Sequence, residues 1–275
     1  MRVTGDGGVG LEVFVDGPED GQPVLLMHGW PDDHQLWRHQ VAALSAAGYR
    51  TVAPDLRGFG ASDKPTEVSA YALKHTVVDM LAVLGAYDVD RAHVVAHDWG
   101  GAAAWGLASF VPDKVESLTV LSVGHPRAFR DAGFRQRMLS WYMLLFNFDV
   151  AEQWFRENGA EMLASHPDAA DRLHALADDA ALTASLGWYR ANAHPRSIVG
   201  DPPALPPVTA PVLGIWSSGD MALTEQQMTG SAAYVGGPWR YERIEGASHW
   251  MQLERPDEVN ALLLDFLAAP GGSGG

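Results

Sequence analysis

The stretch Val94–Gly101, which reads VVAHDWGG, constrains the fold of this chain more than any other part of the sequence. An apolar run typical of a buried strand ends at the small residue Ala96. Asp98 follows two positions later and Gly100 two positions after that, and the stretch AAAWGLASF then has the pattern of a helix. Small residues at positions 96, 100 and 101 let the backbone turn tightly without a Cβ clash. We therefore predict a sharp strand-to-helix turn that holds the side chain of Asp98 above the carboxyl edge of a sheet.

Asp98 stands where a turn of this kind usually holds a Ser nucleophile. A carboxylate is already ionised at neutral pH, and the dipole of the following helix favours its negative charge. Such a group can attack an electrophilic sp³ carbon and form an alkyl ester, which water must then hydrolyse with the help of a general base. The plainer interpretation is that Asp98 only caps the helix, a common role for Asp at this position.

Two later loops supply the other groups that this reaction needs. Asp220 follows the apolar run Val212–Trp216, and His249 lies in the loop after the weaker run Tyr241–Ile244. Either residue could be structural, because Asp is common in turns and the chain contains 11 His. The order Asp98, Asp220, His249 is nevertheless that of nucleophile, acid and base on a sheet of this topology. We predict that Asp220 orients His249, which activates the hydrolytic water.

The motif His28-Gly29-Trp30-Pro31 follows the first long apolar run. The backbone N–H of Trp30 can pair with that of Trp99 to form an oxyanion hole, in which the charge would develop on the Asp98 carbonyl oxygen during ester hydrolysis. We also predict a cis peptide bond before Pro31.

Short apolar runs alternate with helical patterns along most of the chain, which is typical of a parallel sheet with crossover helices. The expected strands are Val24–Met27, Arg50–Ala53, Ala92–Ala96, Leu118–Ser122, Val212–Trp216 and Tyr241–Ile244. Between about residues 127 and 197 the strands stop, and helical periods occur instead at Phe134–Phe146, Val150–Asn158, Arg172–Ala177 and Ala181–Asn192. We therefore predict an α/β fold with a mostly parallel central sheet, helices on both faces and an inserted α-helical cap.

The Pro-rich stretch 201–207 cannot be a helix interior and marks the end of the predicted cap. We expect residues 1–125 and 206–270 to form the two parts of the core, and residues 126–205 to form the cap. Residues 271–275 read GGSGG, a linker-like tail that we exclude from the fold.

Composition excludes several classes of function. With 34 acidic and 19 basic side chains, the chain has a formal net charge of −15, which disfavours nucleic acids and anionic membranes as partners. The chain contains no Cys, so disulfides, thiolate metal sites and Cys nucleophiles are excluded. No apolar run approaches the roughly 20 residues that span a bilayer, and the first residues do not resemble a signal peptide. We expect a cytoplasmic monomer or homodimer.

No His, Asp and Glu residues stand at metal-ligand spacing, and no Gly-rich phosphate loop is present in the sequence. We therefore expect neither a metal nor a cofactor, and a small molecule and water as the only partners in the reaction.

Five stretches make this chain resemble the epoxide hydrolase branch of the α/β-hydrolase superfamily. They read HGWP at 28–31, DLRGFGASDKP at 55–65, AHDWGGAAAW at 96–105, WSSGD at 216–220 and GASHW at 246–250. The letters HDWGG are the most specific, because they narrow the nucleophile to Asp. Haloalkane dehalogenases share that Asp and the Trp after it, so the core alone does not separate the two families.

The predicted cap separates them. Epoxide hydrolases carry two cap Tyr whose phenols hydrogen-bond the epoxide oxygen, and the segments around Tyr142 and Tyr189 resemble theirs. Ring opening leaves an alkoxide that a phenol can stabilise or protonate, whereas a halide leaves without needing a proton. Both Tyr could instead be ordinary helix core, but two matches in family-like contexts favour the functional interpretation.

The resemblance implies an enzyme that opens an oxirane to a vicinal diol through an alkyl ester on Asp98. The aromatic residues expected to line its substrate pocket, each equally compatible with ordinary core, are Trp30, Trp99, Trp141, Phe146, Trp188 and Trp250. Two alternatives stay open: a haloalkane dehalogenase with the same triad, and a non-catalytic ligand-binding protein on the same fold. Trp30 weakens the first, because many dehalogenases carry Asn there, and the intact triad argues against the second.

Four other residues are expected to have structural roles. Arg57 is interpreted as a structural side chain, Asp33 and its neighbour Asp32 as the start of a helix after HGWP, and His97 as a side chain that points away from the pocket.

Overall fold

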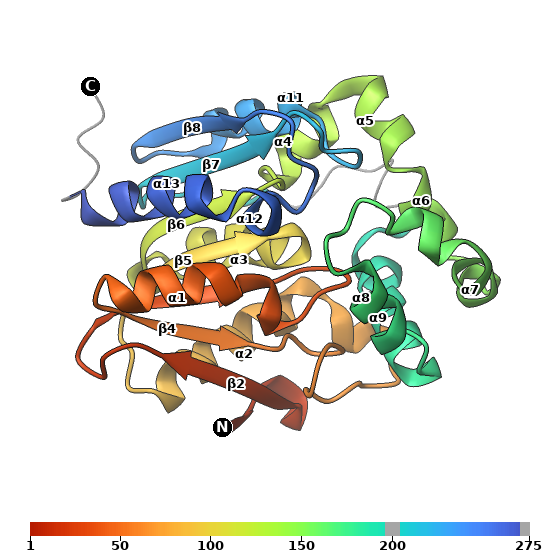
Figure 1. Cartoon of the computed structure of the whole chain (residues 1–275), viewed down its shortest axis with the longest axis horizontal. Coiled ribbons are helices and arrows are strands. Elements are labelled where there is room, and N and C mark those ends of the chain that lie inside the picture. The colour runs from red at the N-terminus through yellow and green to blue at the C-terminus, as the bar shows by residue number, and fades with distance from the viewer. Residues whose placement is uncertain (196–203, 270–275) are drawn as a thin grey trace.

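The computed structural model describes residues 1–195 and 204–269, so the predicted tail 271–275 and residues 201–203 of the Pro-rich stretch lie outside it. Within these residues eight strands form one sheet, in the order β1-β2-β4-β3-β5-β6-β7-β8 (Figure 1). The strands are β1 (Arg2–Thr4), β2 (Gly10–Asp16), β3 (Gln22–Met27), β4 (Tyr49–Pro54), β5 (Ala92–His97), β6 (Val115–Leu121), β7 (Val212–Ser217) and β8 (Trp239–Ile244).

The six strands predicted from apolar runs are β3 to β8, and all their neighbouring pairs are parallel. The structure adds β1 and β2, which pair antiparallel with each other and, through β2, with β4. Strand β6 begins earlier than expected and stops before Ser122, because this residue has a positive φ of 67° that an extended strand cannot accommodate.

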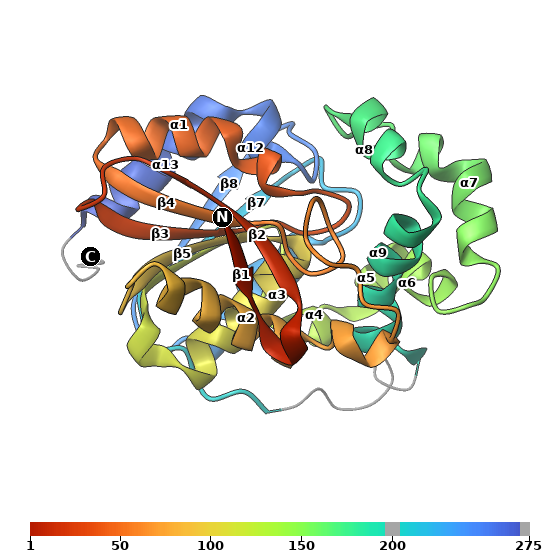
Figure 2. The ribbon, with the colours of Figure 1, turned by 90° about the horizontal axis from the view of Figure 1, so that it is seen from below.

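Helices cover both faces of the sheet, as predicted (Figure 2). Helices α1 (Arg38–Ala46) and α13 (Pro256–Ala268) pack together on one face, with the short α12 (Met251–Glu254) beside them. On the other face α2 (Leu73–Ala86) packs against α3 (Asp98–Phe110), and α11 (Glu225–Thr229) lies near β7. Strands with their central residues fully buried, such as Val24–Met27, therefore form the core between two helical layers.

Six helices lie between β6 and β7 in the described part of the chain, and Figure 1 shows α6 to α9 grouped at one side of the sheet. They are α4 (Pro126–Asp131), α5 (Gly133–Leu139), α6 (Trp141–Leu145), α7 (Ala151–Met162), α8 (Ala169–Ala175) and α9 (Asp179–Asn192). We call them the helical insertion. Helix α4 was not predicted, and it packs against α11 rather than against α6 to α9.

The helix predicted over Phe134–Phe146 is divided into α5 and α6 at Ser140. The Ser140 hydroxyl donates a hydrogen bond to the Gln136 carbonyl oxygen at 2.8 Å and accepts one from Gln136 Nε2 at 3.1 Å. A Ser that bonds to the carbonyl four residues earlier bends or interrupts a helix, which accounts for the break.

Charged side chains join the helical insertion to the core next to the HGWP loop. Arg38 contacts Asp168 at 2.7 Å, and Arg172 contacts Asp33 at 2.7 Å. Asp33 also caps the short 3₁₀-helix after HGWP by accepting from the Gln35 N–H, as predicted for the start of that element. These pairs fix the insertion over the carboxyl ends of the strands.

Arg57 is 1% exposed and has the structural role predicted for it. Its Nε and Nη2 each donate to a carboxylate oxygen of Asp79 at 2.7 Å, and its Nη1 donates to the Ala70 carbonyl at 2.7 Å. The bidentate pair satisfies a buried charge that would otherwise be costly to desolvate.

No helix in the described part of the chain combines the length and apolar character needed to cross a bilayer.

We expect Arg57→Met to lower the free energy of unfolding by about 3–5 kcal/mol, because it leaves the Asp79 carboxylate buried without its partner. Urea unfolding followed by circular dichroism measures this change. The matched control is Arg91→Met, which removes a half-exposed partner of Glu116 and should change stability little. Equal effects of the two substitutions would show that the Arg57 pair is not a buried constraint.

Candidate active site

The predicted strand-to-helix turn places Asp98 at the first residue of α3, directly after β5. Its φ is 50°, in the left-handed region that a non-Gly residue rarely adopts. The turn is possible because two glycines at it have no Cβ. A Cβ on Gly100 would lie 2.3 Å from the Met27 and His28 carbonyl oxygens, and one on Gly29 would lie 2.4 Å from Asp98 Cβ. Glycine at both positions thus allows the β3 and β5 loops to touch.

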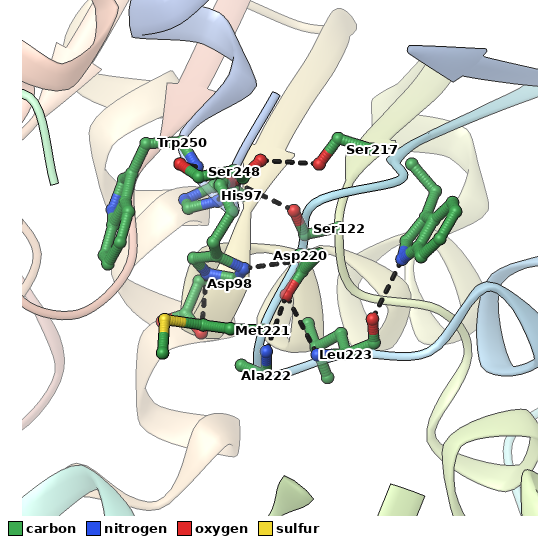
Figure 3. A network of polar contacts seen from close by, with 12 residues as sticks. His97, Asp98, Ser122, Ser217, Asp220, Met221, Ala222, Leu223, Ser248 and Trp250 are labelled. Atoms are coloured by element: carbon green, nitrogen blue, oxygen red, sulfur yellow. Dashed lines mark hydrogen bonds and ion pairs between the residues drawn. The ribbon is translucent and has the colours of Figure 1, made fainter. Parts of the chain in front are cut away.

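The structure brings the three predicted residues of the triad together (Figure 3). His249 Nδ1 lies 2.9 Å from Asp220 Oδ2, and its Nε2 lies 3.7 Å from Asp98 Oδ2. The second oxygen of Asp220 accepts hydrogen bonds from the N–H groups of Ala222 and Leu223 at 2.8 and 2.9 Å. Asp220 is therefore fixed in place and orients the imidazole toward Asp98.

The HGWP loop supplies one of the two expected backbone donors. The Trp30 N–H donates to Asp98 Oδ1 at 2.7 Å, and the peptide bond between Trp30 and Pro31 is cis, as predicted. The equivalent role of the Trp99 N–H stays a prediction.

The protonation states of Asp98 and His249 depend on each other. Burial by itself lowers the pKa of His249, but the charges of Asp220 and Asp98 outweigh it and raise that pKa well above its ordinary value. Burial raises the pKa of Asp98, and the opposing effects of His249 and of the Trp30 N–H leave it below its ordinary value. At neutral pH the ligand-free site therefore holds an ionised Asp98 beside a protonated His249.

Two cavities meet at Asp98, Tyr142 and Tyr189, which line both of them. The first has a volume of about 340 Å³ and the second about 380 Å³. Among the aromatic residues predicted to line the pocket, the first cavity is lined by Trp30, Trp141 and Trp250, and the second by Trp99. Mostly apolar walls on both sides of one carboxylate are typical of a site for an apolar small molecule.

The rings of Tyr142 and Tyr189 lie 5.9 Å apart, on α6 and α9 of the helical insertion. Burial and the nearby charge of Asp98 raise the pKa of Tyr142 and of Tyr189 well above that of free tyrosine. Both phenols are therefore protonated at any physiological pH and can act as hydrogen-bond donors toward a molecule in the cavities that Asp98 also lines.

Phe146 and Trp188 lie outside the lining of both cavities, in contrast to the prediction. Both are fully buried. The Phe146 ring packs against that of Tyr189 at 4.9 Å, and the Trp188 indole donates to the Arg57 carbonyl oxygen at 3.0 Å. Phe146 therefore supports Tyr189, which lines both cavities, and Trp188 anchors the residue before Tyr189 to the core.

The cavity wall also includes residues that the sequence did not indicate. Helix α7 and the loop after Asp220 contribute Trp154, Asn158, Met162 and Met221 to the first cavity. No motif marks these residues, because helical periodicity alone does not tell which face of α7 looks into the site.

The structure agrees with the role predicted for His97 and disagrees with the role predicted for Asp32. His97 is fully buried and points away from the cavities, as predicted. Asp32 does not cap the following helix: its carboxylate contacts His166 Nε2 at 3.0 Å and accepts from the Trp250 indole at 3.1 Å. Asp32 thereby links the helical insertion to the loop that carries His249.

One group of possible metal ligands comes together in the described residues: the neighbours Asp33 and His34 meet Asp55, which lies more distant in the sequence. Hydrogen bonds already occupy these groups. Asp55 accepts from the backbone N–H groups of His34 and Ala61, and Asp33 pairs with Arg172. The cluster is accounted for as a structural network.

Comparison with known proteins agrees with this geometry. A family model described as the alpha/beta hydrolase fold matches residues 22–256. The fold, with Asp98 in a sharp turn after β5 and with Asp220 and His249 after β7 and β8, agrees with the same class. The chain belongs to the α/β-hydrolase superfamily.

Individual relatives narrow this assignment. Epoxide hydrolase A of Mycobacterium tuberculosis is 33% identical, covering 97% of this chain and 96% of that protein. AB hydrolase superfamily protein YfhM of Bacillus subtilis is 32% identical, over 94% and 95% of the two chains. A solved structure described as a novel epoxide hydrolase from metagenomes of hot environments superposes with a TM-score of 0.88, at 30% identity and 98% coverage of both chains. Within the superfamily, the chain belongs to the epoxide hydrolase branch.

We expect Asp98→Asn to lower the pKa of His249, because the substitution removes one of the two carboxylate charges that stabilise the imidazolium. NMR titration of the labelled imidazole groups measures this shift. His125, whose pKa burial lowers to about 4, is an internal control that should not move. An unchanged His249 pKa in the variant would contradict the coupling of the two groups.

Proposed function

We propose that this member of the epoxide hydrolase branch opens an oxirane to a vicinal diol through a covalent ester on Asp98. One observation carries the proposal: an ionised Asp98 lies where two apolar cavities meet, with two protonated phenols lining the same cavities and His249 Nε2 3.7 Å away. This arrangement supplies a nucleophile, proton donors and a base to a single small molecule.

In the first step an Asp98 oxygen attacks a ring carbon, and the carbon–oxygen bond of the oxirane breaks. The electron pair of that bond goes to the oxygen, which Tyr142 and Tyr189 stabilise by hydrogen bonding and one of them protonates. Opening of the strained ring thus yields a hydroxyalkyl ester of Asp98.

In the second step water hydrolyses this ester. Esterification removes the charge of Asp98, so the pKa of His249 falls. The imidazolium then releases its proton, which restores the phenolate left by ring opening to a phenol, and the neutral imidazole becomes a base. The neutral imidazole takes a proton from water as the oxygen attacks the ester carbonyl carbon, and Trp30 N–H stabilises the oxyanion. Collapse of the intermediate breaks the ester bond, and the leaving diol oxygen takes the proton from His249. The carboxylic acid left at Asp98 then transfers its proton to the neutral imidazole, which restores the Asp98 carboxylate beside a protonated His249.

The boundaries of the cap, one oxyanion donor, the cellular location and the oligomeric state are proposed from the sequence. We propose that the helical insertion acts as a cap with the boundaries 126–205, and that the Trp99 N–H completes the oxyanion hole during ester hydrolysis. Cytoplasmic location and a monomeric or homodimeric state are likewise proposed from the sequence. The reaction as written uses only water besides the substrate.

We expect His249→Ala to accumulate the ester when incubated with styrene oxide, because the variant retains the nucleophile but lacks the base. Intact-mass spectrometry should show a mass gain equal to that of the whole epoxide. Asp98→Ala is the control and should show no gain.

Other outcomes of the same experiment would contradict the proposal. A mass gain from a bromoalkane equal to the alkyl group without bromine, with no gain from the epoxide, would indicate a haloalkane dehalogenase. Measurable ligand affinity without any adduct in the folded variant would indicate a binding protein.

We expect Tyr142→Phe and Tyr189→Phe each to slow ester formation about 100-fold, the usual cost of removing one donor to a developing oxyanion. Stopped-flow tryptophan fluorescence under single-turnover conditions measures this step. Tyr71→Phe is the matched control, because the Tyr71 phenol is buried but donates to the Pro65 carbonyl outside both cavities. Ester formation at the wild-type rate in both cavity variants would remove the phenols from the mechanism.

A further inference from the structure

The backbone carbonyl of His249 accepts two buried hydrogen bonds from residues at the ends of neighbouring strands. Figure 3 labels the two donors, His97 and Ser122. Ser122 Oγ, just after β6, donates to it at 3.1 Å, and His97 Nε2, at the end of β5, donates at 3.0 Å. Ser122 and His97 are both fully buried, and neither lines a cavity. The mechanism described above uses neither side chain.

The backbone of Ser122 is held in an unfavourable conformation. Its φ of 67° is in the left-handed region, which is unfavourable for a residue other than Gly. Its N–H donates to the Ile215 carbonyl oxygen at 2.9 Å, and its own carbonyl accepts from Gln227 Nε2 at 2.7 Å. A Gly would adopt this backbone without strain, but it would lack the hydroxyl.

The second donor to the His249 carbonyl oxygen, His97, is an uncharged imidazole. Because Nε2 donates to a carbonyl oxygen, the proton of the neutral ring must be on Nε2. Burial, and then the charge of His249, lower the pKa of His97 to about 4. The His97 ring, 4.5 Å from that of His249, is thus a donor that adds no second positive charge beside it.

We propose that Ser122 is a positioning residue for hydrolysis of the Asp98 ester, acting through the backbone of His249. The inference rests on the proposed two-step reaction. The Ser122 hydroxyl fixes the point from which the His249 side chain extends, so that the imidazole remains between Asp220 and Asp98. A displacement of about 1 Å of a catalytic group can cost 100-fold in rate.

The two steps depend on this contact differently. Ester formation needs Asp98 and the phenols, none of which Ser122 touches. Hydrolysis needs His249 at the correct distance from a water and from the ester. Loss of the hydroxyl should therefore slow the second step and leave the first nearly unchanged, which a general loss of stability would not do.

The test compares Ser122→Ala and Ser122→Gly under single-turnover conditions with styrene oxide, with the ester quantified by quenched intact-mass spectrometry. Both variants should hydrolyse the ester about tenfold more slowly, as expected for the loss of about one net hydrogen bond, and form it within twofold of the wild-type rate. Ser122→Gly should be at least as thermally stable as Ser122→Ala, because it relieves the left-handed strain.

Thr119→Val is the matched control. Thr119 lies in β6 and is fully buried, and its hydroxyl makes no hydrogen bond within the described residues. Both steps should proceed at the wild-type rate in this variant.

Two outcomes would overturn the proposal. Wild-type hydrolysis in Ser122→Gly would show that the hydroxyl is not needed, and equal losses in both steps would indicate a structural role only. If no ester forms in any variant, the proposed reaction fails instead, and NMR titration then decides the positioning role. The pKa of His249 should move toward its ordinary value in Ser122→Gly and stay unchanged in Thr119→Val. An unchanged His249 pKa in both variants would refute the positioning role of Ser122.

Discussion

The contact between the β3 and β5 loops determines the rest of the site. Gly29 and Gly100 let the two loops approach so closely that the Trp30 N–H reaches an Asp98 oxygen at 2.7 Å. The same turn holds Asp98 in a left-handed conformation and directs its carboxylate toward His249. A Cβ at either Gly would push the loops apart, so the positions of Asp98, of the Trp30 N–H and of Asp98 relative to His249 share one steric constraint.

Electrostatics then links the residues that this contact brings together. A buried imidazolium between two carboxylates leaves the group of three side chains with one net negative charge. Tyr142 and Tyr189 line the same cavity and add polar hydrogens to it without adding charge. In the proposed reaction the Asp98 charge is lost to an ester, so the charge balance at His249 changes and the imidazolium becomes a base.

The sequence predicted the parts that depend on topology, and it missed those that depend on side-chain direction. Asp98, Asp220 and His249 follow parallel strands, so their proximity follows from strand order alone. Trp188 points into the core and not into a cavity, a matter of helix rotation that periodicity leaves undetermined. Strands β1 and β2 were missed because their apolar runs are short, and Ser122 because a positive φ at a Ser has no sequence signature.

The position of the helical insertion has a consequence for how the chain folds. Strand β6 ends at Leu121 and its parallel neighbour β7 begins at Val212, so the sheet must close a long loop before the two can pair. Loop closure of this kind slows folding and makes the pairing late. Asp98 belongs to the part of the chain synthesised before the insertion, whereas Asp220 and His249 follow it. A nascent chain therefore carries Asp98 well before it has the two groups that contact it, and the site is complete only when the last strands have formed.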